Sequence, residues 1–179
     1  MELVAVLHNI RSVHNVGSIF RTADGAGVGK LYLCGITPSP FDRFKNVRPD
    51  FAKVALGAEK SVAWAMEKDT AVAIAALKKE GYEIIALEQS ARAIPYYRAL
   101  ADKASHGGEK KIALILGAEV DGISDDLLAL VDCVIDIPMH GGKESLNVSV
   151  AFGVAAYGLR YSSGLEYLEY NESNKDNVQ

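Results

Sequence analysis

The chain has 179 residues, of which 49% are hydrophobic and 23% charged, a composition typical of a single globular domain. No apolar run approaches the ~20 residues of a membrane span, and the N-terminus lacks a basic, cleavable leader, so we expect neither membrane insertion nor secretion. The net charge of −4 argues against a uniformly basic nucleic-acid-binding surface, and the two cysteines in apolar surroundings suit a reducing cytoplasm.

Apolar strand candidates alternate with helical patterns, which predicts an α/β fold with a largely parallel sheet. The expected strands are residues 3–7, 31–34, 83–87, 112–116 and 133–137. A first helix is expected on the core stripe of Val16, Ile19, Phe20 and Ala23. Further helices are expected at 69–80, at 124–130 and from 145 or 147 to 161. We therefore expect one domain over residues 1–165 and an acidic, flexible tail over residues 166–179.

One long connection, residues 37–55, combines prolines, aromatic rings and cations. Its phenylalanines are Phe41, Phe44 and Phe51. Long irregular loops are often functional, and rings beside cations suit unpaired bases and phosphates. A surface loop held down by its phenylalanines is the alternative. The cations that we expect to contact RNA are Arg43, Lys45 and Arg48, together with Arg11 ahead of the first helix.

A first polar segment, residues 15–21, contains a glycine inside the predicted first helix. Gly17 costs that helix about 1 kcal/mol relative to alanine, which makes sense if another backbone or a ligand approaches closely. Arg21 lies four residues further on and shares a helix face with Gly17, directed away from the core stripe. A guanidinium beside such a gap suits a phosphate, whereas an ordinary solvated arginine is the alternative.

A second segment follows the predicted strand 112–116. Gly117 and Gly122 bracket a short loop that contains Glu119. Ligands of α/β proteins bind at the carboxyl ends of strands, so this loop is a candidate ligand site, and a plain tight turn is the alternative.

The third segment, residues 137–151, joins a strand end, a glycine-rich turn and an apolar helix. Gly141 and Gly142 would let the backbone approach a ligand closely. Ser145 and Asn147 are good helix caps that also present a hydroxyl and an amide, although a capped core helix is the simpler alternative. Patterns for a dinucleotide site, a phosphate-binding loop, a serine hydrolase or a metal site are absent from the sequence.

Together the three segments resemble the SpoU/TrmH branch of the SPOUT RNA methyltransferases over roughly residues 3–160. The matching positions are Asn15, Gly17 and Arg21, then Gly117, Glu119 and Gly122, then 137–139 with 145–149. The resemblance implies a SPOUT-type parallel sheet flanked by helices with a C-terminal trefoil knot, and an obligate homodimer. It also implies an S-adenosylmethionine-dependent 2′-O-ribose methyltransferase acting on RNA, with tRNA expected before rRNA. A catalytically silent RNA- or nucleotide-binding member of the fold is the alternative.

The resemblance also implies roles for individual residues. The cofactor is expected against Gly117, Ile137, Met139 and Leu146. The expected catalytic residues are Arg21, Asn15, Glu119, Ser145 and Asn147. The family's arginine is proposed as a general base, but arginine has a pKa above about 12, so we interpret it as a positioning and electrostatic group. The resemblance implies that many relatives carry an additional N-terminal RNA-binding domain. We expect none in this protein, so RNA selection is expected from the catalytic dimer, the 37–55 loop or another protein. No metal is expected.

Overall fold

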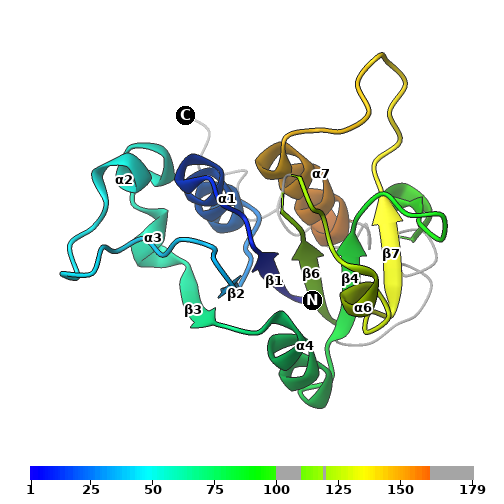
Figure 1. Ribbon diagram of the computed structural model, residues 1–179, viewed down its shortest axis with the longest axis horizontal. Helices are drawn as coiled ribbons and strands as arrows, with labels where there is room; N and C mark the ends of the chain where they lie inside the picture. The colour runs from blue at the N-terminus through cyan, green and yellow to red at the C-terminus, as the bar shows by residue number, and fades with distance from the viewer. Residues whose placement is uncertain (100–109, 119, 162–179) are drawn as a thin grey trace, which may run out of the picture.

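A seven-stranded sheet organises the part of the chain that the structure describes, residues 1–99, 110–118 and 120–161 of the computed structural model (Figure 1). The strands are β1 (Glu2–His8), β2 (Lys30–Cys34), β3 (Ala63–Glu67), β4 (Glu83–Leu87), β5 (Ile94–Pro95), β6 (Lys111–Leu116) and β7 (Cys133–Asp136). Their order is β3-β2-β1-β6-β4-β7-β5, and each pair of neighbours in it runs parallel. The predicted α/β class and parallel sheet are therefore confirmed.

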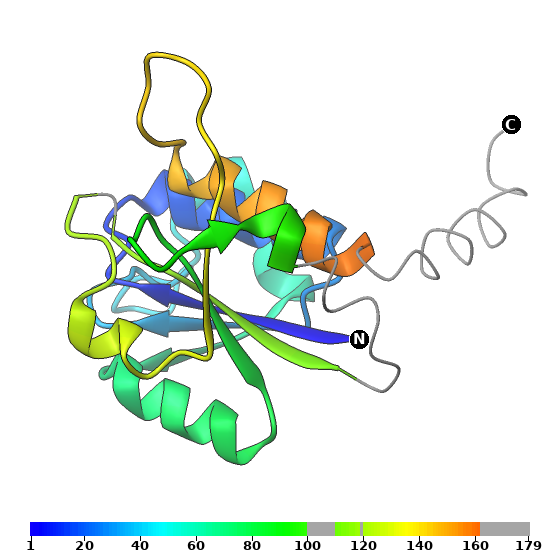
Figure 2. The ribbon, with the colours of Figure 1, turned by 90° about the vertical axis from the view of Figure 1, so that its right-hand side faces the viewer.

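Helices cover both faces of this sheet. They are α1 (Val13–Gly25), α2 (Pro49–Ala55), α3 (Ala58–Ser61), α4 (Thr70–Lys79), α6 (Asp125–Leu128) and α7 (Val148–Tyr161). Successive side chains of a strand point to opposite faces, so Leu3, Ala5 and Leu7 join one core cluster while Val4 and Val6 join another. The first cluster lies under α1, α2 and α7, and the second lies under α4 and α6 (Figure 2).

The strands found beyond the five expected ones lie at the two edges of the sheet. β3 is an edge strand that is only half-buried, and β5 has two residues, one of them a proline. β5 is too short to show a run of apolar residues, and the apolar run of β3 contains two alanines and no β-branched residue, which is a weaker strand signal. The expected helix at 69–80 is confirmed as α4, and its cap Asp69 accepts a hydrogen bond from Ala71 N at 2.8 Å. The helix expected at 124–130 is shorter, since α6 ends at Leu128.

The expected irregular connection over residues 37–55 is partly wrong, because its last seven residues form α2. Proline at the start of α2 has the backbone angle that a helix needs and lacks an N–H that would be unpaired there anyway. Phe51 is fully buried, with its ring centroid 5.1 Å from that of Phe20 in α1. Phe51 therefore belongs to the core and is not available to RNA.

Gly17 faces α2 rather than open solvent, which corrects its expected placement. A Cβ on Gly17 would overlap Cγ2 of Val54 and lie 3.2 Å from the carbonyl oxygen of Phe51. Of the two causes suggested for this glycine, another backbone or a ligand, the structure shows the first: Gly17 allows α1 and α2 to pack closely.

The trefoil knot stays a prediction from the resemblance. The acidic tail of residues 166–179 lies outside the described residues, as do residues 162–165 of the predicted domain. Among the described helices, none has both the length and the apolar character needed to cross a membrane. No cluster of His, Cys, Asp and Glu suited to a metal ion occurs in the described part of the chain.

Candidate active site

A pocket of about 510 Å³ opens at the carboxyl ends of β4, β6 and β7. Parallel strands end at the same edge of a sheet, so the loops that follow them converge there. The pocket's apolar wall is formed by Leu87, Leu116, Ile137, Leu146, Val148 and Ala151. Its volume lies within the range of small-molecule and cofactor sites.

The four residues expected to bind the cofactor all line this pocket: Gly117, Ile137, Met139 and Leu146. The structure shows why residue 117 has no side chain. A Cβ there would overlap the carbonyl carbon of Gly122 and lie 2.6 Å from its oxygen and 2.7 Å from Cγ1 of Ile123. Gly117 therefore lets the loop of residues 117–122 close on itself, which shapes one wall of the pocket.

The turn at Gly141 and Gly142 makes no close approach to other described residues, and its expected approach to a ligand stays a prediction. A Cβ added at either glycine would meet no atom of the described residues within 4 Å, and neither has a left-handed backbone. Both glycines are exposed. None of the described residues excludes a side chain from these two positions.

Asn147 connects the third segment to the first. Its Nδ2 donates to Oδ1 of Asn15 at 3.2 Å, across 132 positions of the sequence. Its Oδ1 accepts from the backbone N–H of Ser149 at 3.0 Å and from the Ser149 hydroxyl at 2.7 Å. Asn147 thus caps the first turn of α7 and holds the start of α1 beside the pocket.

Not all of the other expected catalytic residues line the pocket. Ser145 lines the pocket but lies three residues ahead of α7. Arg21 is exposed on α1 and is not among the residues that line the pocket. Arg21 lies six positions after Asn15, which is about 9 Å along a helix. Glu119 lies outside the described residues.

Two pocket residues that the sequence reasoning missed, Glu88 and Gln89, follow β4 directly. Glu88 accepts hydrogen bonds from Gln89 N at 2.8 Å and from Ile123 N at 2.9 Å, which fixes the loop after β6. The Gln89 amide donates to the carbonyl oxygen of Glu144 in the loop before α7. This dipeptide therefore ties two walls of the pocket to the end of β4. The sequence could have indicated Glu88, because it follows an apolar strand directly, as Gly117 does.

Asp136 also lines the pocket, and its Oδ1 is buried without a hydrogen-bond partner in the described structure. A buried carboxylate oxygen without a partner is costly, so a donor or a cation from a bound molecule would stabilise it. S-adenosylmethionine offers hydroxyl and amino donors and a positive sulfonium, and its adenine suits the apolar wall. The residues present therefore fit this cofactor.

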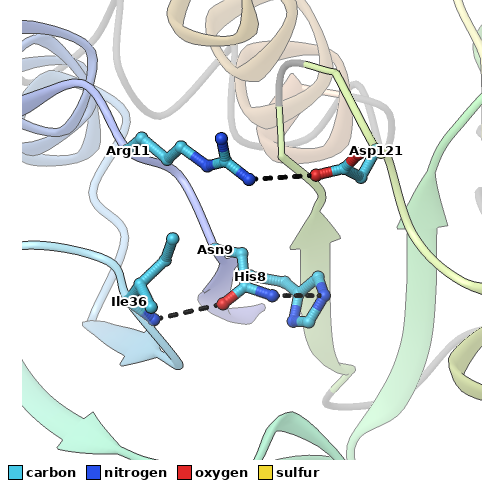
Figure 3. A network of polar contacts seen from close by, with 5 residues as sticks. All are labelled: His8, Asn9, Arg11, Ile36 and Asp121. Carbon is cyan, nitrogen blue, oxygen red and sulfur yellow. Dashed lines mark hydrogen bonds and ion pairs between the residues drawn. The ribbon is translucent and has the colours of Figure 1, made fainter.

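A polar network fixes the chain between β1 and α1 (Figure 3). Asn9 has a left-handed backbone, and its Oδ1 accepts from Ile36 N at 3.1 Å. Its Nδ2 therefore donates to Nε2 of His8 at 3.1 Å, so Nδ1 of His8 carries the proton and donates to the Thr70 hydroxyl. Burial lowers the pKa of His8, which keeps this ring in the neutral form that the network needs.

Arg11, an expected RNA contact, pairs with Asp121 at 3.2 Å (Figure 3). This ion pair connects the chain after β1 to the loop after β6. Both side chains are about two-thirds exposed, so the ion pair contributes little stability. Arg11 could therefore exchange Asp121 for another anion, such as a phosphate. Arg43 and Lys45 lie exposed on the loop before α2, whereas Arg48 is half-buried at its N-cap.

Comparison with known proteins shows the family to which the chain belongs. The model of the SpoU rRNA Methylase family matches residues 2–157. The chain belongs to the SpoU family. A SpoU relative from Ralstonia nicotianae, the 23S rRNA (guanosine-2'-O-)-methyltransferase RlmB, is 33% identical over 155 residues, which are 87% of this chain and 57% of the relative. A tRNA (guanosine(18)-2'-O)-methyltransferase from Thermus thermophilus is 32% identical over 160 residues, 87% of this chain and 73% of the relative.

Solved structures show the same SpoU fold. The TrmH/SpoU tRNA modifying enzyme of A. aeolicus gives a TM-score of 0.77 at 24% identity, covering 94% of this chain and 79% of that one. The AdoMet-bound rRNA methyltransferase from Sinorhizobium meliloti gives 0.75 at 24% identity, covering 89% and 56%. A structure concerned with 2-OH methylation of C/U34 on tRNA gives 0.69 at 28% identity, covering 90% and 95%. The chain thus spans little more than half the length of the rRNA methyltransferases that it matches.

Proposed function

We propose that the protein is an S-adenosylmethionine-dependent RNA 2′-O-ribose methyltransferase. The observation that carries the proposal is the pocket at the ends of β4, β6 and β7, where the Asn15–Asn147 hydrogen bond brings the first and third segments together. The names of the SpoU relatives add support, because several of them transfer a methyl group to a ribose oxygen of RNA.

When bound, the cofactor supplies an electrophilic methyl group on a sulfonium. Ile137 and Leu146 would hold its adenine, while the carboxylates of Glu88 and Asp136 favour a cationic ligand in the pocket. Asn15, Asn147, Ser145 and Glu119 would orient the ribose, because in-line placement of the 2′-oxygen is the main requirement of the transfer. Arg21 would position the substrate and stabilise negative charge at the oxygen that loses its proton.

Among RNA substrates we propose tRNA before rRNA, with Arg11, Arg43, Lys45 and Arg48 as RNA contacts. In support, proteins named for tRNA are among the relatives and solved structures that the chain matches, and those named for rRNA keep rRNA as the alternative. A cytoplasmic location and the trefoil knot remain predictions from the sequence and the resemblance.

The test combines the purified chain with labelled S-adenosylmethionine and unmodified transcripts of tRNA or rRNA. We expect label in tRNA, at a ribose recovered as a 2′-O-methyl nucleoside, and no transfer when that ribose is 2′-deoxy. Calorimetry with the cofactor separates the alternatives. A catalytically silent member would bind RNA or a nucleotide without binding the cofactor and would methylate neither RNA. Methylation of a base would contradict the proposal outright.

We also propose a homodimer built on the exposed side of α7. Its Phe152, Ala155 and Leu159 are buried against the sheet. Val150 and Tyr157 are seven residues apart on another face and are 52% and 40% exposed. A second copy would cover this apolar face, and the same patch meeting itself produces a two-fold dimer.

Light scattering at micromolar concentration should give about twice the 19.2 kDa of one chain. Val150→Asp should shift the protein toward the monomer, because it would bury a charge in the interface. The matched substitution Val72→Asp, on the exposed face of α4, should leave the mass unchanged. A monomeric wild-type chain that methylates RNA at full rate would contradict this proposal.

A further inference from the structure

The turn between Phe41 and Val47 is a preformed hairpin tip. Phe41 and Val47 form an antiparallel bridge at its base. At its tip, Oδ1 of Asp42 accepts from Phe44 N at 2.8 Å and from Asn46 N at 2.9 Å. These bonds, with that from Asn46 the larger influence, lower the pKa of Asp42, so the carboxylate that organises the tip is ionised at neutral pH. Lys45 completes the turn with a left-handed backbone.

The base of this hairpin is anchored to the sheet. The Phe41 ring stacks on Trp64 of β3 at 5.9 Å between centroids, with the planes 27° apart. Arg48 N donates to the carbonyl oxygen of Pro40 at 2.9 Å and leads the chain into α2. The tip is therefore held on two secondary-structure elements, and its order does not depend on a ligand.

Phe44 differs from the other two phenylalanines of this segment. Phe51 is in the core and Phe41 is stacked on Trp64, whereas Phe44 is 68% exposed at the tip. The guanidinium of Arg43 lies over its ring, 4.7 Å from the centroid. Phe44 is therefore the one phenylalanine of this segment whose ring is available to a binding partner.

The charged residues near Phe44 in the sequence indicate which kind of molecule would bind to its ring. Arg43 lies over the ring, Lys45 follows Phe44 directly and Arg48 stands four residues further on, with Asp42 as the single carboxylate of residues 42–46, although the whole chain has a net charge of −4. Aromatic rings flanked by cations bind unpaired nucleotides, because the ring stacks on a base while the cations contact the neighbouring phosphates. A base paired in a duplex has no exposed face for such stacking.

We propose that the tip of residues 42–46 is a stacking site for one unpaired nucleotide of the RNA, with Phe44 as the platform and Arg43 and Lys45 as phosphate contacts. This inference rests on the proposed RNA-directed function, and it narrows the substrate to RNA that presents a single-stranded loop or end. The Figure 1 view places this segment at the β3 edge of the sheet, away from β7, so the site would select RNA at a distance from the pocket.

The test measures binding of the full chain to a fluorescent single-stranded 12-nucleotide RNA and to the same sequence as a duplex. Phe44→Ala should raise the Kd for the single strand about 5- to 150-fold, the equivalent of ~1–3 kcal/mol for one lost stack. The Kd for the duplex should change less than about twofold. Phe44→Trp should restore tight binding, and Val72→Ala, a similarly exposed apolar position on α4, should have no effect.

Salt dependence separates stacking from charge. Phe44→Ala should leave the slope of log Kd against log salt unchanged, whereas Lys45→Ala should reduce its magnitude by about 0.7. If the wild-type chain binds no RNA, the proposed function itself fails. If it binds single strands and Phe44→Ala binds them equally well, only the stacking site is wrong. The stacking site is also wrong if Phe44→Ala instead alters the dimer mass, since the tip would then contact a second copy.

Discussion

Arg21→Ala is expected to lower the single-turnover rate of methyl transfer at least tenfold while the affinity for S-adenosylmethionine stays unchanged. A bidentate, charge-assisted contact contributes roughly 1.5–3 kcal/mol, and each 1.4 kcal/mol is a factor of ten in rate. The cofactor should bind normally because Arg21 lies on α1 and is not part of the pocket wall. Rate and affinity are measured by rapid quench with a methyl-accepting RNA and by calorimetry.

Two further variants make this prediction specific. Arg21→Lys should rescue the rate poorly, since an ammonium keeps the charge and loses the planar fork. Lys79→Ala, which removes an exposed cation at the end of α4 on the other face of the sheet, should methylate at the wild-type rate. Normal turnover by Arg21→Ala, or a loss explained entirely by weaker cofactor binding, would show that the proposed role is wrong.

Gly117→Ala should reduce the affinity for S-adenosylmethionine at least tenfold, even though it adds only one methyl group. That methyl has no space, because Gly122 and Ile123 occupy its position. The loop after β6 would have to move, and Glu88 would lose its hydrogen bond to Ile123 N. Calorimetry with the cofactor gives the affinity, and thermal unfolding monitors the fold.

Gly29→Ala is the matched control for this prediction. Gly29 precedes β2 and does not line the pocket, and a Cβ there would meet only the carbonyl oxygen of Leu3, at an ordinary contact distance of 3.7 Å, among the described atoms within 4 Å. Its cofactor affinity and melting temperature should therefore stay close to those of the wild type. If Gly117→Ala binds the cofactor as tightly as Gly29→Ala does, the loop after β6 is not a wall of the cofactor site.

The sequence alone determined the buried strands and the helix with the clearest local signals. A run such as residues 112–116 is apolar because both of its faces are covered, and Asp69 caps α4 through a bond two residues away. Such patterns depend on residues that are close together in the sequence, so they can be recognised without a structure. The edge strands β3 and β5 gave a weaker signal, because β5 has two residues and β3 lacks β-branched residues. Both are stabilised by pairing with strands that are distant in sequence.

The site was found by resemblance, but only the tertiary structure decided what each of its residues contacts. Gly17 was recognised as a place of close approach, and the approaching element is α2 rather than a ligand. Gly117 was expected beside the cofactor, and the structure adds that Gly122 leaves no room there for a side chain. Phe44 and Phe51 look equivalent in the sequence, and one is exposed while the other is core. A local pattern reports how a residue is disposed within its own element, whereas packing partners come from segments that can lie 132 positions away, as Asn15 and Asn147 do.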